Sequence, residues 1–299
     1  MAVGIVVEYN PFHNGHIRQL NWIKSNFPNE KIIVVMSEKY SQRGEIIVVP
    51  YKVRVKFAKK YGVDQVLPLT FEETVQAAHI FAKNAIQKLY AAGVDKLVFG
   101  SESNDVTKMK QLAANIITHK ATLDTKIKHY IKAEKLGYPK AYALATKDIF
   151  GEAFEQPNDI LGMEYIKYIL ENNLPIDIFT IKRNVEFHSL ETTEHYASAT
   201  FLRALIKQKG DLSPFSPLPN KFRDRTDKFY RQFQKILTKT PIAKLQTIPL
   251  VSEGIENLLL KNVQIATYDK FVDTCTSKRY TRSKIKRIMA WIVEKKWAK

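Results

Sequence analysis

Short β-branched runs alternate with amphipathic stretches over about the first 205 residues, and this alternation constrains the fold more than any other feature of the sequence. The opening run, 2–8, is apolar and is followed by a loop and then by an amphipathic stretch at 15–27. Strands covered by helices on both faces have nearly continuous apolar runs of this kind. The pattern predicts an α/β fold with a Rossmann-like parallel sheet, in which ligands bind at the carboxyl ends of the strands.

The other expected elements continue this alternation. Further strands are expected at 31–36, 64–69, 96–100 and 176–181. Helices are expected at 50–61, 72–92, 160–170 and 197–207, with a mostly helical insertion at about 105–155. A proline-dense connector, 213–219, ends the pattern, and helical periodicity with many basic residues follows it. We therefore expect an α/β domain at 1–210 and a smaller, all-helical domain at 220–299.

Charge and composition narrow the class of partner. The formal net charge of +17 favours a polyanion, with nucleic acid as the first candidate, although a lysine-rich solvated surface gives the same total. The single cysteine, Cys275, excludes an internal disulfide. No apolar run is long enough for a membrane helix and the start lacks a basic leader, so we expect a cytoplasmic protein.

The residues between the first strand and the first helix carry the sharpest chemical signal. They read Asn10-Pro11-Phe12-His13-Asn14-Gly15-His16, with an HxGH element at the mouth of the helix. A helix start offers free backbone N–H groups and the positive end of a dipole, which suits a triphosphate. Gly15 lets the backbone approach phosphates closely, and both histidines can donate to phosphate oxygens as charge builds up at the α-phosphorus. This context predicts an ATP site, whereas an isolated HxGH string would indicate ordinary surface or core histidines.

Five blocks, taken in order, carry a resemblance to a known family. The blocks are 6–16, 35–37 with 41–45, 99–102, 157–162, and 197–200 with Arg203. Together they resemble the bacterial tRNA(Met) cytidine acetate ligases of the HxGH nucleotidyltransferase superfamily. The resemblance covers about the first 205 residues well and the helical remainder loosely, through 278–282.

The resemblance implies a reaction in two steps. Acetate and ATP give acetyl-adenylate and pyrophosphate, and the acetyl group then passes to the N4 amine of the wobble cytidine of elongator tRNA(Met), giving N4-acetylcytidine without acetyl-CoA. A carboxylate is a poor acyl donor until its oxygen is bound to a good leaving group, which AMP supplies. The implied substrates are ATP with Mg²⁺, acetate and tRNA(Met).

Carried over position by position, the resemblance implies an ATP site built from separate segments. The implied ATP-binding residues are Val6, Val7, Glu8, Tyr9, Asn10, Pro11, Phe12, His13, Asn14, Gly15, His16, Gly100, Asn158, Arg183, Ser198 and Thr200. The implied catalytic residues are His13, His16 and Arg203. Asn158 has a helix N-cap as an equal alternative. Arg183 follows a strand, where a guanidinium can clamp phosphate, and its alternative is a solvated surface charge.

Two further groups of polar residues have competing interpretations. Ser198, Thr200 and Arg203 begin a helix, as in the ISSTxxR element of the superfamily that holds the outgoing phosphates, but Ser198 is alternatively a plain cap. Glu8 and Glu102 could polarise a group or assist Mg²⁺, although an isolated carboxylate at a strand end is more often a local hydrogen-bond acceptor. We assign no ligand of a protein-bound metal.

The basic end of the chain and one loop are the candidates for tRNA binding. The assigned residues are Arg43, Lys278, Arg279, Arg282, Lys284, Lys286 and Arg287. Tyr280, Trp291 and Trp297 are interleaved, so that cations would bind phosphate while aromatic faces stack on loop bases. The alternative for the helical end is a core-facing helix with a wet, basic side, and for Arg43 an exposed loop arginine.

Two other functions compete with the acetate ligase. One is a small-metabolite adenylyltransferase of the same superfamily, against which the basic helical end argues. The other is a catalytically reduced tRNA-binding protein, against which the intact histidines argue. The sequence leaves the oligomeric state open.

Overall fold

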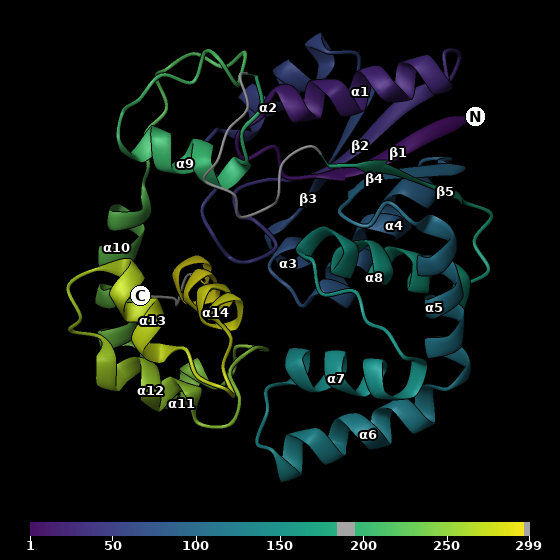
Figure 1. Ribbon diagram of the computed structural model, residues 1–299. Coiled ribbons are helices and arrows are strands. Elements are labelled where there is room, and N and C mark those ends of the chain that lie inside the picture. Colours follow the sequence, from purple (N-terminus) through teal and green to yellow (C-terminus); the bar gives the residue numbers. More distant parts are fainter. Residues whose placement is uncertain (184–194, 296–299) are drawn as a thin grey trace.

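The computed structural model describes residues 1–183 and 195–295. Within these residues five strands form one parallel sheet in the order β3-β2-β1-β4-β5 (Figure 1). The strands are β1 (Ala2–Val7), β2 (Lys31–Ser37), β3 (Gln65–Leu69), β4 (Lys96–Ser101) and β5 (Asp177–Lys182). The expected α/β class with a parallel sheet is confirmed, and each strand lies within a residue or two of its expected place.

Helices cover both faces of the sheet, as the apolar runs require. The helices α1 (Asn14–Asn26) and α2 (Tyr51–Lys60) pack with Val3, Ile5 and Val7 of β1. The helices α4 (Ala78–Ala91), α5 (Val106–Thr118) and α8 (Pro157–Glu171) pack on the other face, with Ile33 and Val35 of β2. Alternate residues of a strand thus enter opposite cores, and each large apolar side chain buried this way contributes about 1.5–3 kcal/mol.

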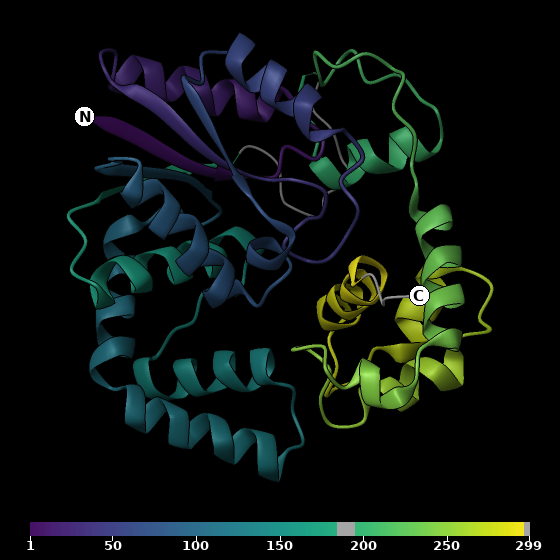
Figure 2. The ribbon, with the colours of Figure 1, turned by 180° about the vertical axis from the view of Figure 1, so that it is seen from behind.

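The region expected to be a helical insertion contains α5, α6 (Lys120–Ala133) and α7 (Tyr138–Phe150). The helices α6 and α7 lie side by side away from the sheet (Figures 1 and 2). At their connection, Gly137 packs closely against the backbone carbonyl of Lys278, where a Cβ atom would come within 2.5 Å of that oxygen. The tip of this pair of helices therefore touches the basic end of the chain.

The single long helix expected at 72–92 is wrong. The chain instead forms the short α3 (Phe71–Thr74), a break, and then α4. The carbonyls of Val75 and Gln76 in the break accept hydrogen bonds from Trp291 Nε1, Arg287 and Gln42. The helix stops because these distant donors replace the intrahelical bonds that a continuous helix would make.

The second half of the chain is helical after α9 (Ala199–Lys207), as expected. It contains α10 (Thr226–Lys239), α11 (Ile242–Leu245), α12 (Ile255–Asn262), α13 (Tyr268–Cys275) and α14 (Arg282–Glu294). Their core is continuous with Tyr40 and Val75 of the α/β part. Figure 2 shows α14 as the helix of this group nearest to α3. None of the helices formed by 1–183 and 195–295 is both long enough and apolar enough to cross a membrane.

Candidate active site

The candidate site lies where the chain changes direction across the sheet. β1 pairs with β2 on one side and with β4 on the other, so the connections from these strands leave toward opposite edges. Such a switch point leaves a crevice outside the carboxyl ends of the strands, where ligands of parallel α/β proteins bind. The segment 10–16 follows β1, and Glu102 follows β4, so the topology brings these two predicted segments to the crevice.

His13 and His16 form a reciprocal cap at the start of α1. His13 Nδ1 accepts from the backbone N–H of Gly15 at 3.1 Å, and His16 Nδ1 accepts from the backbone N–H of His13 at 3.2 Å. The two rings stack with their centroids 3.7 Å apart. Because both Nδ1 atoms act as acceptors, each neutral ring carries its proton on Nε2. Each histidine therefore keeps one N–H donor that the cap does not use.

Both rings are held neutral. Burial, with smaller effects from Arg183 and Arg203, lowers the pKa of His13 to about 3. Burial, together with His13 and Arg183, lowers the pKa of His16 well below its usual value. Two stacked imidazolium rings beside two guanidinium groups would repel one another, so the site favours uncharged donors. A triphosphate bound here would gain hydrogen bonds from these rings at neutral pH.

The neutral state of His13 makes stability depend on pH. Its folded pKa lies below its unfolded value, so the folded state binds fewer protons and the free energy of unfolding falls as the pH drops from about 6.5 toward 3. The loss approaches about 1.4 kcal/mol per pH unit for such a group. Urea unfolding of the wild type should show this loss relative to His13→Asn, which keeps an acceptor for Gly15 but does not titrate. Parallel stability curves for the two proteins over about pH 5 to 7 would contradict it.

The apolar residues assigned to ATP binding lie in the protein interior. Phe12 is fully buried, Tyr9 and Val7 are almost so, Pro11 is buried and Val6 is partly buried. Tyr9 and Phe12 both contact the His16 ring, with centroids 4.6 and 5.7 Å away. These side chains support the histidines. Any contact between these residues and a nucleotide would have to involve their backbone atoms.

Ser198, Thr200 and Arg203 lie together at the start of α9. Ser198 is buried and its Oγ accepts from the backbone N–H of Phe201 at 3.0 Å, so the cap that the sequence allowed as an alternative is present. Arg203 donates to Thr200 Oγ1 at 3.2 Å and to the carbonyl of Asn10 at 3.1 Å. The arginine thereby joins α9 to the first residue of the histidine-bearing loop.

Glu102 connects the ends of β4 and β5 to the start of α8. It accepts from Asn158 Nδ2 at 2.5 Å and from the backbone N–H of Asp159 at 3.1 Å, and it lies 3.9 Å from Arg183 Nε. Asn158 is not the N-cap that the sequence left as an alternative, because Gln156 holds that position. Its side chain is partly buried. Gly100 lies against the side chain of Arg183. The structure thus brings together Gly100, Asn158 and Arg183, the three ATP-binding residues predicted at this edge of the site.

The candidate tRNA-binding residues divide into two groups. Lys278, Arg279 and Arg282 are exposed, with Arg279 3.8 Å from Glu253 and Arg282 paired with Asp273.

The others are partly buried, and two of them, Lys286 and Arg287, contact the α/β part. Lys286 binds Glu45, Arg287 donates to the carbonyl of Gln76, and Lys284 donates to Ser252 Oγ. Arg43 lies near enough to Glu8, Glu45 and Arg287 to influence their pKa values. These positions do not form one exposed patch.

The aromatic part of the tRNA prediction is wrong for two residues. Tyr280 and Trp291 are buried, and Tyr280 and Trp291 Nε1 hydrogen-bond to the carbonyls of Glu253 and Val75. Their faces belong to the core of the helical part and are not available for stacking. Trp297 lies outside the described residues.

Sequence reasoning missed Arg54, which is fully buried in α2. Its guanidinium donates to the carbonyls of Val49, Glu8 and Ser37 at 2.7–2.9 Å and also to that of Glu38. Burial lowers its pKa to about 10, so it stays charged at neutral pH. The signal was present, because Arg54 shares the inward face of the helix with Ala58, four residues away.

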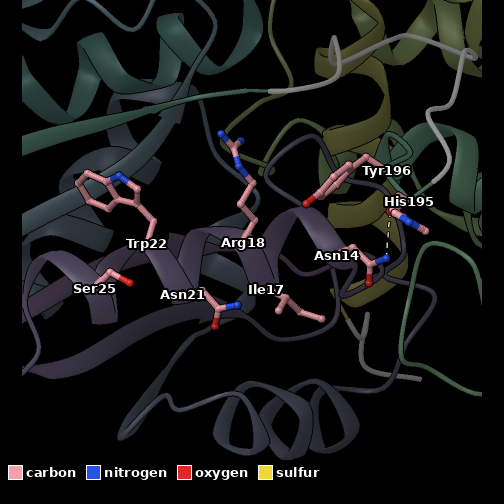
Figure 3. Close-up of a pocket in the computed structure, with 8 residues that line it drawn as sticks. All are labelled: Asn14, Ile17, Arg18, Asn21, Trp22, Ser25, His195 and Tyr196. Atoms are coloured by element: carbon pink, nitrogen blue, oxygen red, sulfur yellow. Dashed lines mark hydrogen bonds between the residues drawn. The ribbon is translucent and has the colours of Figure 1, made fainter.

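A groove runs along α1 beside the histidine loop (Figure 3). Its volume is about 460 Å³, within the range of small-molecule sites. The lining residues are Asn14, Ile17, Arg18, Asn21, Trp22, Ser25, His195 and Tyr196. Asn14 anchors one end by donating to the carbonyl of His195 at 2.9 Å. The groove thus begins one residue after His13.

Known proteins are similar to this chain over nearly its whole length. A family model described as HIGH Nucleotidyl Transferase matches residues 1–296. The tRNA(Met) cytidine acetate ligase of Mycoplasmopsis synoviae is 49% identical over 99% of this chain and 97% of its own length, and that of Mycoplasma mobile is 46% identical over 98% of both.

Solved structures agree as well. Thermotoga maritima TmcAL without ligand is 29% identical, with a TM-score of 0.85 over 98% of this chain and 75% of that one. The same protein bound with alpha-thio ATP aligns over the same shares with a TM-score of 0.83.

Proposed function

The chain belongs to the tRNA(Met) cytidine acetate ligase family of HIGH nucleotidyltransferases, and from that premise we propose that it uses ATP to acetylate the N4 amine of a tRNA cytidine. The substrate tRNA is elongator tRNA(Met), the acetylated base is the wobble cytidine, and the acyl source is acetate. The observation that carries the proposal is the pair of neutral histidines at the start of α1, at the switch point of the sheet.

The proposed first step takes place at the α-phosphorus of ATP. An acetate oxygen attacks the phosphorus, the bond to the bridging oxygen of pyrophosphate breaks, and acetyl-adenylate and pyrophosphate form. The Nε2–H groups of His13 and His16 would donate to the phosphate oxygens on which charge builds up. Arg203 and Arg183, which lie close enough to influence the pKa of His13, would offset the charge of the outgoing phosphates.

The proposed second step releases AMP. The cytidine N4 attacks the acetyl carbonyl carbon, the carbon–oxygen bond breaks so that AMP leaves with its electron pair, and the proton lost from the amine is released to solvent. Magnesium is proposed to enter with the triphosphate as part of the substrate. Glu8 and Glu102, the nearby carboxylates, already accept from the backbone of Gln42 and from Asn158, and no metal-ligand cluster occurs among residues 1–183 and 195–295.

We also propose that residues 1–210 activate acetate and 220–299 bind tRNA, and that the enzyme works in the cytoplasm, where its tRNA substrate is found. The test combines labelled acetate, ATP and total tRNA, followed by nucleoside analysis. Labelled N4-acetylcytidine that requires ATP and is not supported by acetyl-CoA alone is the expected result. Transfer of AMP to a metabolite without acetate would instead favour the small-metabolite adenylyltransferase.

The exposed basic residues predict a measurable salt dependence. In the Lys278→Ala/Arg279→Ala double variant, tRNA binding should weaken. The slope of log K against log salt should become shallower by about 1 to 2, because binding through fewer phosphate contacts releases fewer counterions from the tRNA. Gel shifts at several salt concentrations measure it, with Lys270→Ala on α13 as an exposed control. An unaltered slope would assign both side chains to solvent.

A further inference from the structure

The helix α14 packs tightly on the loop that follows β2. Gly44 has a φ of +83°, and a Cβ atom at this position would lie 2.6 Å from the backbone of Lys286 and Arg287. Around this contact, Glu294 binds Lys39 and accepts from the hydroxyl of Tyr40 at 2.8 Å. The loop and the helix therefore fit together backbone against backbone, with ion pairs at either side.

Glu45 lies at the centre of a chain of charges that crosses this contact. On one side its carboxylate binds Lys286 Nζ at 2.5 Å, and that lysine is only 15% exposed. On the other side it lies 4.0 Å from Arg203. Burial alone would raise the pKa of Glu45, but Lys286 and Arg203 outweigh it and the pKa is lowered. The carboxylate is thus held ionised between two cations from different parts of the chain.

Arg203 in turn contacts the histidine-bearing loop, residues 10–16. Nη1 of Arg203 donates to the carbonyl of Asn10, three residues before His13, whereas Nη2 is the nitrogen near Glu45. The guanidinium is shared between that carbonyl, Thr200 and Glu45. Its orientation therefore depends on the charge of Glu45, which depends on Lys286.

From these contacts, and resting on the function proposed above, we propose that Glu45 is a positioning residue for Arg203 and that Lys286 holds Glu45 in place. The helical part would then act on nucleotide activation itself, in addition to any contact with tRNA. Lys286 accordingly influences a half-reaction in which tRNA takes no part.

Changing either partner of the pair has a distinct expected result. Glu45→Gln keeps the size of the side chain but removes the counter-charge of Arg203. We expect acetate-dependent ATP–pyrophosphate exchange, measured without tRNA, to fall about tenfold or more because a preorganised cation is lost. The dissociation constant of a non-hydrolysable ATP analogue should not rise, because the site becomes more positive.

Lys286→Met has the opposite electrostatic effect. Glu45 then loses the cation at 2.5 Å, so its carboxylate attracts the Arg203 guanidinium more strongly and draws it away from the carbonyl of Asn10. Exchange should again fall about tenfold, while the dissociation constant of the analogue rises about threefold or more. Calorimetry measures the dissociation constant of the analogue independently of turnover.

Lys39→Met is the matched control. Lys39 forms its ion pair with Glu294, between the same loop and the same helix, but does not contact Arg203. Both readouts should stay within about twofold of the wild type, because surface ion pairs contribute little. If Lys286→Met and Lys39→Met behave alike, the pair merely joins two surfaces and the inference is overturned.

Two further outcomes separate this inference from the proposed function. Exchange in Glu45→Gln at the wild-type rate would overturn the positioning role while leaving the function intact. A folded wild type that binds the analogue but shows no acetate-dependent exchange would remove the proposed function. The analogue affinities of Lys286→Met and Lys39→Met would then decide the inference alone, with equal affinities overturning it.

Discussion

A His16→Ala variant is expected to lose acetate-dependent ATP–pyrophosphate exchange by about a thousandfold or more, because it removes a neutral N–H donor where charge develops. tRNA binding, measured by gel shift, should stay nearly unchanged, since Lys278, Arg279 and Arg282, the exposed residues assigned to tRNA binding, lie in the helical part. His16 Nδ1 also accepts from the backbone N–H of His13. The alanine variant is therefore expected to lose about 1 kcal/mol of stability as well.

Two further variants separate the donor from the cap. In His16→Asn the side-chain oxygen can replace Nδ1 as the acceptor for His13, but nothing replaces Nε2–H. In His16→Gln the amide nitrogen can approach the position of Nε2. We expect the asparagine variant to recover stability without exchange, and the glutamine variant to recover part of the exchange. Equal loss of exchange and tRNA binding in the alanine variant would show that His16 is structural.

An Arg54→Met variant is expected to lower the free energy of unfolding by about 3 to 5 kcal/mol, because it leaves several buried carbonyls without donors. Those carbonyls belong to Glu8, Ser37, Glu38 and Val49, at the ends of β1 and β2 and in the loop between β2 and α2. The loss should therefore extend to ATP affinity. Urea unfolding and calorimetry with an ATP analogue measure the two effects.

The control for Arg54 lies on the same helix. Lys52→Met changes an exposed cation of α2 and should leave both quantities unchanged within error. Arg54→Lys keeps the charge but offers a single ammonium in place of the guanidinium fork, so only partial recovery is expected. If Arg54→Met unfolds at the wild-type denaturant concentration, the carbonyls find water or other donors and the clamp has no energetic role.

The local part of the site could be predicted from the sequence. A β-branched run followed by a turn and an amphipathic stretch places His13 and His16 at a helix start whatever the rest of the chain does. The tautomers of the two rings could not be predicted in this way. They follow from which backbone N–H group each Nδ1 meets at the cap.

The basic residues show the same division between what the sequence predicts and what only the structure decides. The basic character of the helical end is visible in the sequence, but the direction of each cation is not. Lys278 is exposed, whereas Lys286, eight residues later, is mostly buried against Glu45. Because one side of α14 faces the α/β part, helical periodicity identifies an inward face without identifying what lies across from it.

By itself, the sequence determined the α/β class, the order of the strands along the chain, the place of the histidine motif and the helical nature of the second half, because each is encoded by periodicity within a few neighbouring residues. The tertiary structure decided the break at 75–77, the buried position of Arg54 and the contact of Lys286 with Glu45. That last pair is separated by 241 residues, and the donor of Trp291 is 216 residues from the carbonyl it satisfies. Such partners meet only when the sheet and the helical part pack together, since a buried polar group takes whichever donor or acceptor the fold brings within reach.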